Sequence, residues 1–275
     1  MNRFEGKVAF VTGGARGQGR SHALRLAREG ADVVAVDIVD QLASVQYRMA
    51  TPADLAETEQ AVRDLGRRFL GITADVRDQA QVDAAVEQAY AEFGRVDVVL
   101  ANAGILPSTG PQAQEMSAWH DTIATNLSGV YYTLKAFAPR LIEAGVPAAV
   151  CITGSTSSFR GVAYKPEMLS PGHMAYGAAK HGVLALMKNF AMVLGKYRIR
   201  VNTVIPAGVD TPMTNNEYFR AELASDAPGG WMANVMEHGL VDAGDISDAV
   251  LWLCSDQAAF VTGTALPVDM GTLLI

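Results

Sequence analysis

A short apolar run near the start of the chain leads directly into a cluster of glycines and then into a helical pattern. Residues 7–11 are of β-branched and aromatic type, and a helix pattern covers 20–29 before Gly30. In a strand–turn–helix unit, glycines allow a tight turn and let the backbone approach a pyrophosphate at the helix N-terminus. The intervening stretch therefore predicts a dinucleotide-binding turn. The residues expected to contact the cofactor here are Gly13, Arg16, Gly17, Gln18 and Gly19.

Strand and helix patterns alternate along the rest of the chain. The further expected strands cover 32–37, 69–73, 96–101, 148–153, 200–205 and 265–268. The further expected helices cover 52–65, 79–93, 117–143, 176–195 and 246–255, with Asp78 and Asp245 as N-caps. Strands that alternate with helices are typical of a parallel sheet covered by helices on both faces. Because no linker divides the chain, we expect one doubly wound α/β domain over residues 1–275.

The composition of the chain excludes several other classes. Apolar residues make up 49% and charged residues 19% of the 275, which is unlike a disordered chain. The 29 acidic residues outnumber the 22 basic ones without a basic tract, so no nucleic-acid partner is expected. Cys151 and Cys254 lie in separate apolar runs, which indicates buried thiols in a reducing compartment. Without a signal-peptide core, a membrane-length run or metal-ligand spacing, we expect a cytoplasmic protein with no membrane or metal partner.

The second expected strand ends on a carboxylate, Asp37, 18 residues after Gly19. At this position a carboxylate accepts hydrogen bonds from both hydroxyls of an adenosine ribose and repels a 2′-phosphate. Arg16 favours NADP instead, because a basic group in the glycine turn can meet the 2′-phosphate. We give Asp37 more weight, so the sequence favours NAD over NADP. The alternative is that Asp37 is an exposed turn residue or a helix N-cap.

Small and polar residues follow three further strands at the same edge of the expected sheet. Asp75 and Val76 come just after the third strand, where an adenine would lie. The turn that follows the fourth strand leaves room for a cofactor, and we expect contacts there from Asn102, Ala103 and Gly104. After the sixth strand the expected cofactor contacts are Pro206, Gly208, Val209 and Thr211.

Tyr176 and Lys180 are spaced i and i+4, which places both side chains on one face of a helix. Taken alone, such a pair is more typical of a surface helix with a half-buried tyrosine. The context favours catalysis, because hydride transfer at a carbinol carbon requires a proton to move on or off the oxygen. A phenol has a pKa near 10, roughly three units too high for a base at neutral pH. We expect the Lys180 ammonium and a positive nicotinamide ring to lower that pKa.

Two more side chains fit this chemistry. Ser155 stands just beyond the end of the fifth strand, where its hydroxyl can hold the substrate oxygen, although Ser157 and Ser158 offer rival hydroxyls. Asn126 interrupts an apolar helical face. It is either a satisfied buried amide or a group that holds a water between Lys180 and solvent.

Two long segments are expected to cover the site. Residues 38–51 form a polar connection that is longer than the usual βα loop. Residues 212–240 are rich in loop signals but carry several large apolar side chains, namely Met213, Phe219, Trp231, Met232 and Met236. We expect the second segment to form a lid over an apolar substrate, with packing onto the body or a subunit contact as alternatives.

In order and spacing, these residues resemble the short-chain dehydrogenase/reductase family over essentially the whole chain. The resemblance rests on Thr12-Gly13-x-x-x-Gly17-x-Gly19, Asp37, Asn102-Ala103-Gly104, Asn126, Ser155, Tyr176-x-x-x-Lys180 and Pro206-x-Gly208. It implies a Rossmann fold with a seven-stranded parallel sheet, NAD as cofactor and a homotetramer. It also implies a catalytic set, which is Asn126, Ser155, Tyr176 and Lys180.

One departure from the family pattern is the spacing of 21 residues from Ser155 to Tyr176, which is longer than usual. This long loop, the segment 38–51 and the glycine turn resemble more narrowly the mycofactocin-associated, carveol-dehydrogenase-like branch. That branch is thought to hold NAD without exchange and to pass electrons to a separate redox carrier. We therefore expect residues 38–51 to fold over the adenosine and slow the release of NAD.

These features predict an NAD-dependent alcohol dehydrogenase that acts on an apolar secondary alcohol or its ketone, of terpenoid or alicyclic type. A carbonyl or 3-oxoacyl reductase is the alternative among enzymes, but that role usually draws on NADPH, which Asp37 disfavours. An alternative of another class is a non-catalytic NAD-binding sensor or scaffold, since a fold alone does not establish catalysis.

Overall fold

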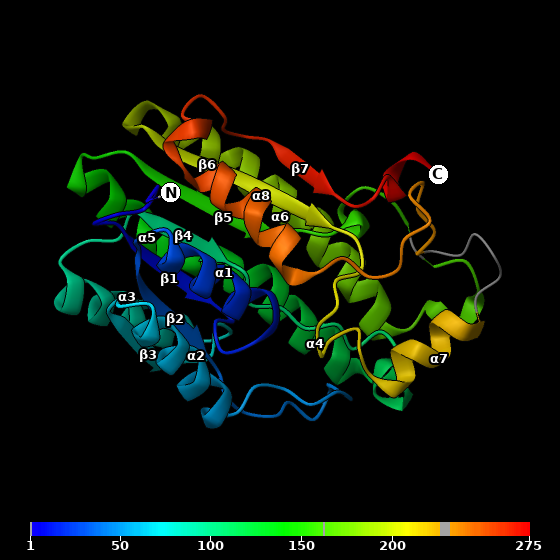
Figure 1. Ribbon diagram of the computed structural model, residues 1–275. Helices are drawn as coiled ribbons and strands as arrows, with labels where there is room; N and C mark the ends of the chain where they lie inside the picture. Colours follow the sequence, from blue (N-terminus) through cyan, green and yellow to red (C-terminus); the bar gives the residue numbers. More distant parts are fainter. Residues whose placement is uncertain (1, 162, 226–231) are drawn as a thin grey trace.

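The computed structural model describes residues 2–161, 163–225 and 232–275. Within them, seven parallel strands form one sheet in the spatial order β3-β2-β1-β4-β5-β6-β7 (Figure 1). The strands are β1 (Val8–Thr12), β2 (Asp32–Asp37), β3 (Phe69–Thr73), β4 (Val98–Ala101), β5 (Ala148–Thr153), β6 (Ile199–Pro206) and β7 (Ala265–Val268). The order reverses between β1 and β4, the kind of switch point at which open α/β sheets bind ligands. The predicted doubly wound fold is confirmed.

Helices cover both faces of this sheet. One face packs against α1 (Gly17–Arg28), α2 (Pro52–Asp64) and α8 (Ala243–Cys254). The other face packs against α3 (Gln79–Phe93), α5 (Gly129–Ala144) and α6 (Pro171–Leu194). A further helix, α7 (Glu217–Ser225), lies beyond the carboxyl ends of the strands (Figure 1). No helix within the described residues is both long enough and apolar enough to span a bilayer.

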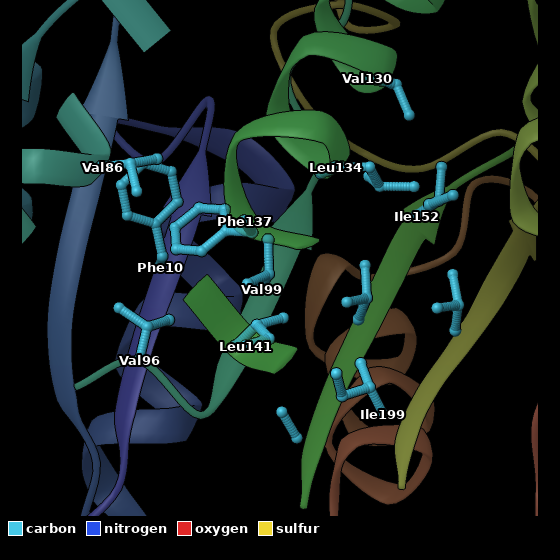
Figure 2. Close-up of a cluster of buried hydrophobic side chains, with 14 of the residues drawn as sticks. Phe10, Val86, Val96, Val99, Val130, Leu134, Phe137, Leu141, Ile152 and Ile199 are labelled. Atoms are coloured by element: carbon cyan, nitrogen blue, oxygen red, sulfur yellow. The ribbon is translucent and has the colours of Figure 1, made fainter. Parts of the chain in front are cut away.

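Side chains of the strands alternate between the two faces, so each strand contributes to two clusters of buried residues. On the face covered by α5, Phe10, Val99 and Ile152 point toward Leu134 and Phe137 (Figure 2). The rings of Phe10 and Phe137 meet edge to face with their centroids 4.7 Å apart, an arrangement that aromatic pairs favour. This packing holds α5 against the strands whose carboxyl ends carry the site.

Two helices begin earlier than the sequence pattern predicts. Helix α1 begins at Gly17 rather than residue 20, and Gly19 in its first turn packs tightly: a Cβ there would lie 1.9 Å from the carbonyl oxygen of Gly13. Helix α6 begins at Pro171 rather than near residue 176. The hydroxyl of Ser170 caps this helix by accepting from the His173 amide at 3.3 Å. The turn that contains His173 is therefore helical and not the end of a loop.

The N-cap predicted for α8 is wrong. The helix begins at Ala243, and the carboxylate of Asp242 accepts from the Gly244 amide at 2.6 Å. Asp245 lies in the first turn instead, where a negative charge still interacts favourably with the helix dipole. Two aspartates three residues apart offer the same local signal, so the sequence pattern did not separate them.

The helical segment predicted over 117–143 is divided by an irregular turn. Helix α4 (Met116–Ile123) and α5 are joined by a π-helical turn, Ala124–Ser128, that contains Asn126. Turns of this kind inside helices are frequent at functional sites. Gly129, which begins α5, packs closely on Val76: an added Cβ would lie 2.9 Å from the valine side chain.

The two cysteines lie together in the core, although they are far apart in the sequence. Cys151 is on β5 and Cys254 ends α8, and both are buried and free. The neighbouring thiol of Cys254 and burial together raise the pKa of the Cys151 thiol. Both thiols are buried, as the apolar runs around them predicted.

Candidate active site and cofactor cavity

Two adjoining cavities lie at the carboxyl ends of the strands. The first, here called the cofactor cavity, extends from the glycine turn after β1 across the ends of β2, β3 and β4. The second, the reaction cavity, lies over the ends of β5 and β6 beside α6. Five residues line both cavities and mark their junction: Gln18, Asn102, Gly104, Thr211 and Met213. A molecule that spans the switch point can therefore reach from one cavity into the other.

The glycine turn can approach a ligand closely because it has no room for side chains of its own. A Cβ on Gly13, whose φ is +67°, would lie 2.9 Å from the Cα of Ala103, and one on Gly14 would lie 2.7 Å from the Cβ of Ala35. Nearby, Nη1 of Arg16 and Oε1 of Gln18 are buried without a hydrogen-bond partner among the described residues. Unsatisfied buried groups of this kind favour a bound polar ligand. The turn thus fits the phosphates of a dinucleotide.

Asp37, at the end of β2, lines the cofactor cavity and is half-buried. Its carboxylate accepts from the amides of Ala15 at 3.0 Å and Val39 at 3.4 Å, which hold it at the end of the strand. Burial raises the pKa of this carboxyl group, while the two amide hydrogen bonds and the Arg16 charge oppose the rise. Asp37 is therefore neither an exposed turn residue nor an N-cap of a helix, the alternatives left open by the sequence.

Every residue predicted to contact the cofactor lines one of the two cavities. Those in the cofactor cavity are Gly13, Arg16, Gly17, Gln18, Gly19, Asp37, Asp75, Val76, Asn102, Ala103, Gly104 and Thr211. Those in the reaction cavity are Gln18, Asn102, Gly104, Tyr176, Lys180, Pro206, Gly208, Val209 and Thr211. Strand ends bring these residues together from six separate stretches of sequence, as the βα pattern predicted.

The reaction cavity brings the side chains of Ser155, Tyr176 and Lys180 together. The Ser155 hydroxyl is near enough to the Tyr176 phenol to lower its pKa. Nζ of Lys180 lies 5.6 Å from the centroid of the Tyr176 ring and donates to the carbonyl oxygen of Thr153 at 2.6 Å. The i, i+4 spacing on α6 therefore does place the phenol and the ammonium on one face.

The pKa values in this group differ in part from expectation. Burial raises the pKa of the Tyr176 phenol, and the nearby Ser155 hydroxyl offsets only part of the rise. Burial also lowers the pKa of the Lys180 ammonium to about 8. In the protein alone, Lys180 does not lower the pKa of Tyr176 as expected, because desolvation dominates and the ammonium is directed at Thr153.

The three candidate hydroxyls in the loop after β5 have different roles. Ser155 Oγ accepts from the Ser157 amide at 3.1 Å, while Ser158 Oγ accepts from the Ser155 amide at 3.2 Å. Ser157 lines the reaction cavity, whereas Ser158 does not. Of the three, only Ser155 acts on the pKa of the Tyr176 phenol, which favours it over its neighbours.

Asn126 lies behind the site rather than in it. Its Oδ1 accepts from the Ile105 amide and its Nδ2 donates to the Ile105 carbonyl, both at 2.8 Å. Each end of the side-chain amide therefore has one protein partner, and the water-holding role stays a prediction. The two hydrogen bonds tie the π-helical turn to the segment after β4, where Ile105 lines the cofactor cavity.

Several lining residues were not identified individually from the sequence. Residues 38–51 were expected to cover the cofactor. Five residues of this segment line the cofactor cavity: Ile38, Leu42, Tyr47, Met49 and Ala50. In the reaction cavity the unpredicted residues include Leu106 and Ser108. For the residues of segment 38–51, the sequence signal was the presence of apolar side chains in an otherwise polar loop.

The segment expected to form a lid contributes to the reaction cavity. Met213, Phe219 and Met232 line it, and Phe219 on α7 is fully buried. Met236 is 71% exposed and lies outside the cavity. Trp231 falls outside the described residues.

Comparisons with known proteins agree with this geometry. Residues 13–272 match the family model described as enoyl-(acyl carrier protein) reductase. The chain is 46% identical over 270 residues to an uncharacterized oxidoreductase of Mycobacterium tuberculosis, covering 97% of this chain and 96% of the relative. It is 38% identical over 285 residues to (-)-trans-carveol dehydrogenase of Rhodococcus erythropolis, with 100% of each chain covered.

A solved structure is similarly close. The crystal structure of carveol dehydrogenase from Mycobacterium avium in complex with NAD superimposes with a TM-score of 0.90 at 41% identity, with 100% of both chains covered. The chain belongs to the short-chain dehydrogenase/reductase family and is an oxidoreductase. Within that family it has carveol dehydrogenases among its relatives, as the glycine turn and the long loops predicted.

Proposed function

We propose that this protein interconverts an apolar secondary alcohol, of terpenoid or alicyclic type, and its ketone. The observation that carries the proposal is the grouping of Ser155, Tyr176 and Lys180 in one cavity that adjoins the cofactor cavity, with the Lys180 ammonium 5.6 Å from the Tyr176 ring. A hydroxyl pair next to a buried ammonium suits the removal of a proton from a carbinol oxygen. The relatives named carveol dehydrogenase support the alicyclic class.

The cofactor is NAD. The glycine turn would hold the pyrophosphate, Asp37 would meet the adenosine ribose, and Asp75 and Val76 would lie beside the adenine, since all of them line the cofactor cavity. Bound NAD supplies the hydride acceptor for alcohol oxidation. The relative from Mycobacterium avium was crystallised with NAD, and the carboxylate of Asp37 disfavours the 2′-phosphate of NADP. The same carboxylate argues against a 3-oxoacyl reductase that depends on NADPH.

We assign the proton transfer to Tyr176, which takes the hydroxyl proton of the alcohol as the carbonyl forms and returns one in the reverse direction. The Ser155 hydroxyl holds the same substrate oxygen. Lys180 keeps a positive charge beside the phenol at neutral pH, because its pKa remains about 8 despite burial. Asn126 positions the segment after β4 through Ile105 and does not contact the reacting atoms in this assignment.

Apolar walls support the apolar substrate. Leu106, Met213, Phe219 and Met232 line the reaction cavity, and three of them come from the expected lid over 212–240. Burial of an apolar ring against such side chains stabilises the complex by about 25 cal/mol for each Å² removed from water. A lid that closes on the substrate also keeps water from the site.

We also propose that residues 38–51 cover the adenosine of NAD and slow its release. Tyr47, Met49 and Ala50 are buried and line the cofactor cavity, and Val45 packs with them on Ile105. A cofactor retained through successive turnovers requires a second redox carrier to accept its electrons. The expected redox carrier and homotetramer remain predictions.

The Tyr176→Phe variant tests the assigned chemistry. We expect turnover of carveol with NAD to fall by a factor of about 10² or more, because the general base is lost, while the amount of bound NAD stays at the parent level. Tyr197→Phe, at the exposed end of the same helical segment, is the matched control and should turn over like the parent. Equal activity of Tyr176→Phe and the parent would contradict the mechanism. A parent that binds NAD but converts no alcohol or ketone would favour the sensor alternative.

A further inference from the structure

His173 lies one helical turn before Tyr176 on α6 and has no role in the chemistry assigned above. Its side chain is buried, with 5% of its surface exposed, and it lines the reaction cavity. Positions i and i+3 share one face of a helix, so the imidazole and the phenol face the same space. His173 lies in the 21-residue stretch from Ser155 to Tyr176 that departs from the family pattern.

One ring nitrogen of this histidine is unsatisfied. Nε2 is buried and has no hydrogen-bond partner among the residues that the structure describes. Burial lowers the pKa of His173, against the attraction of Glu222, so the ring is neutral at pH 7. A neutral imidazole can donate from one nitrogen and accept at the other. A buried polar atom without a partner costs stability in the free protein, and a ligand that satisfies it removes that cost.

A third cavity, which is polar, adjoins the reaction cavity beside His173. It is lined by Ser108, Lys165, Glu167, His173 and Glu222 among others, and Ser108 and His173 line both cavities. Lys165 is paired with Glu222 at 2.7 Å. One lysine and two glutamates leave a net negative charge there, which disfavours a carboxylate on the ligand. The boundary between the two cavities is thus polar but suited to a neutral group.

We propose that His173 selects alcohols that carry a second neutral oxygen, a hydroxyl or a carbonyl, on the side of the ring away from the reacting carbon. The inference rests on the proposed function, because it assumes that Ser155 and Tyr176 hold the reacting oxygen. Ser108, which lines the same boundary, can share the second oxygen. His173 is then a specificity-determining residue of the reaction cavity.

The test compares trans-1,4-cyclohexanediol with cyclohexanol in the protein loaded with NAD. We expect the parent to prefer the diol by about tenfold in kcat/KM, the value of one additional hydrogen bond. His173→Leu should abolish this preference, and His173→Gln, which keeps hydrogen-bonding atoms, should restore part of it. His181→Leu is the control, because His181 is exposed on the same helix; its preference should match the parent.

Two readouts that do not depend on turnover complete the test. Calorimetric binding of the two alcohols to the NAD-loaded parent should show the same preference. The thermal midpoint of ligand-free His173→Leu should rise by about 2–4 °C, because the unsatisfied nitrogen is removed. Equal affinity for the two probes, or a lowered midpoint with the preference unchanged, would overturn the inference. Failure of the proposed function is distinct, since it appears as the absence of any alcohol oxidation.

Discussion

The ammonium of Lys180 donates to the carbonyl oxygen of Thr153, the last residue of β5, at 2.6 Å. This hydrogen bond joins α6 to the strand whose end carries Ser155. Because Lys180 ties α6 to β5, the Tyr176 phenol on α6 and the Ser155 hydroxyl just beyond β5 are held in place relative to each other. The lysine thus has a positioning effect in addition to its charge.

Replacing Lys180 by Met tests how much stability this buried charge costs. Burial lowers the pKa of Lys180 from 10.5 to about 8, and at about 1.4 kcal/mol for each pKa unit the charged form costs about 3 kcal/mol. The lost hydrogen bond to Thr153 offsets about 1 kcal/mol of the gain. We therefore expect Lys180→Met to be more stable at pH 7 by about 2 kcal/mol and strongly impaired in turnover. Chemical denaturation and steady-state kinetics measure the two effects.

The same pKa shift fixes the sign of the pH dependence. Between pH 8 and 10.5 the unfolded chain still binds the Lys180 proton, while the folded chain has released it. The cost of the charge is therefore fully present below pH 8 and is relieved as the pH rises toward 10.5. The stability difference between the variant and the parent should narrow over that range. A difference that stays constant from pH 7 to 10 would show that Lys180 is not desolvated.

Asp37 should set the preference for NAD over NADP. In Asp37→Asn the side chain can still accept from the Ala15 amide, but the negative charge that opposes a 2′-phosphate is gone. Arg16, whose Nη1 has no partner in the described part of the chain, is then free to meet that phosphate. We expect kcat/KM with NADP to rise by about tenfold or more and kcat/KM with NAD to fall.

The control for this change is Asp40→Asn, which removes a charge from an exposed side chain of the same segment. It should leave the ratio of the two kcat/KM values unchanged. An equal loss with both cofactors in Asp37→Asn would mean that the carboxylate supports the fold of the turn and does not discriminate between them.

Local signals explain which parts of the site could be predicted from the sequence. The glycine turn, Asp37 and the Tyr176–Lys180 pair each lie at the end of a strand or on one helix face. Their positions therefore follow from the order and period of the elements. The start of α6 at Pro171 has a local signal as well, because Ser170 caps the helix and proline is favoured at the first helical position. The close packing of Gly172 is different: a Cβ there would lie 1.9 Å from the carbonyl oxygen of Pro107, far away in the sequence. No local pattern contains that information.

The same reasoning accounts for Tyr47 and His173. Tyr47 Oη accepts from the Leu106 amide at 3.0 Å, across 59 residues of sequence. His173 reaches the boundary between two cavities whose other walls come from distant parts of the chain. Propensity and period describe single elements, so side chains that act between elements are found only when the fold is known.

The core beneath the site should be sensitive to loss of volume at Phe137. The side chain is fully buried against Phe10, with the ring centroids 4.7 Å apart. Phe137→Ala should lower the free energy of unfolding by about 3–5 kcal/mol, because it removes apolar contacts and leaves a cavity. Phe137→Leu, which keeps most of the volume, should cost less than about 1.5 kcal/mol. Similar losses in both variants, measured by chemical denaturation, would mean that the aromatic pair and not the volume stabilises this cluster.

The last prediction concerns the segment 38–51, which a hydrogen bond fastens over the cofactor cavity. Ser44 Oγ donates to Asp121 on α4 at 2.6 Å, and Asp121 also pairs with Arg77 beyond the end of β3. Ser44→Ala removes the first contact and leaves an oxygen of the half-buried Asp121 carboxylate with one donor fewer, at a cost of about 1 kcal/mol. Because that cost loosens the segment, bound NAD should dissociate several-fold faster, as measured by exchange with labelled NAD. Ser117→Ala, an exposed change on the same helix, should release NAD at the parent rate. If Ser44→Ala and Ser117→Ala both release NAD at the parent rate, this hydrogen bond does not govern NAD retention. That result would contradict the proposal that residues 38–51 slow the release of NAD.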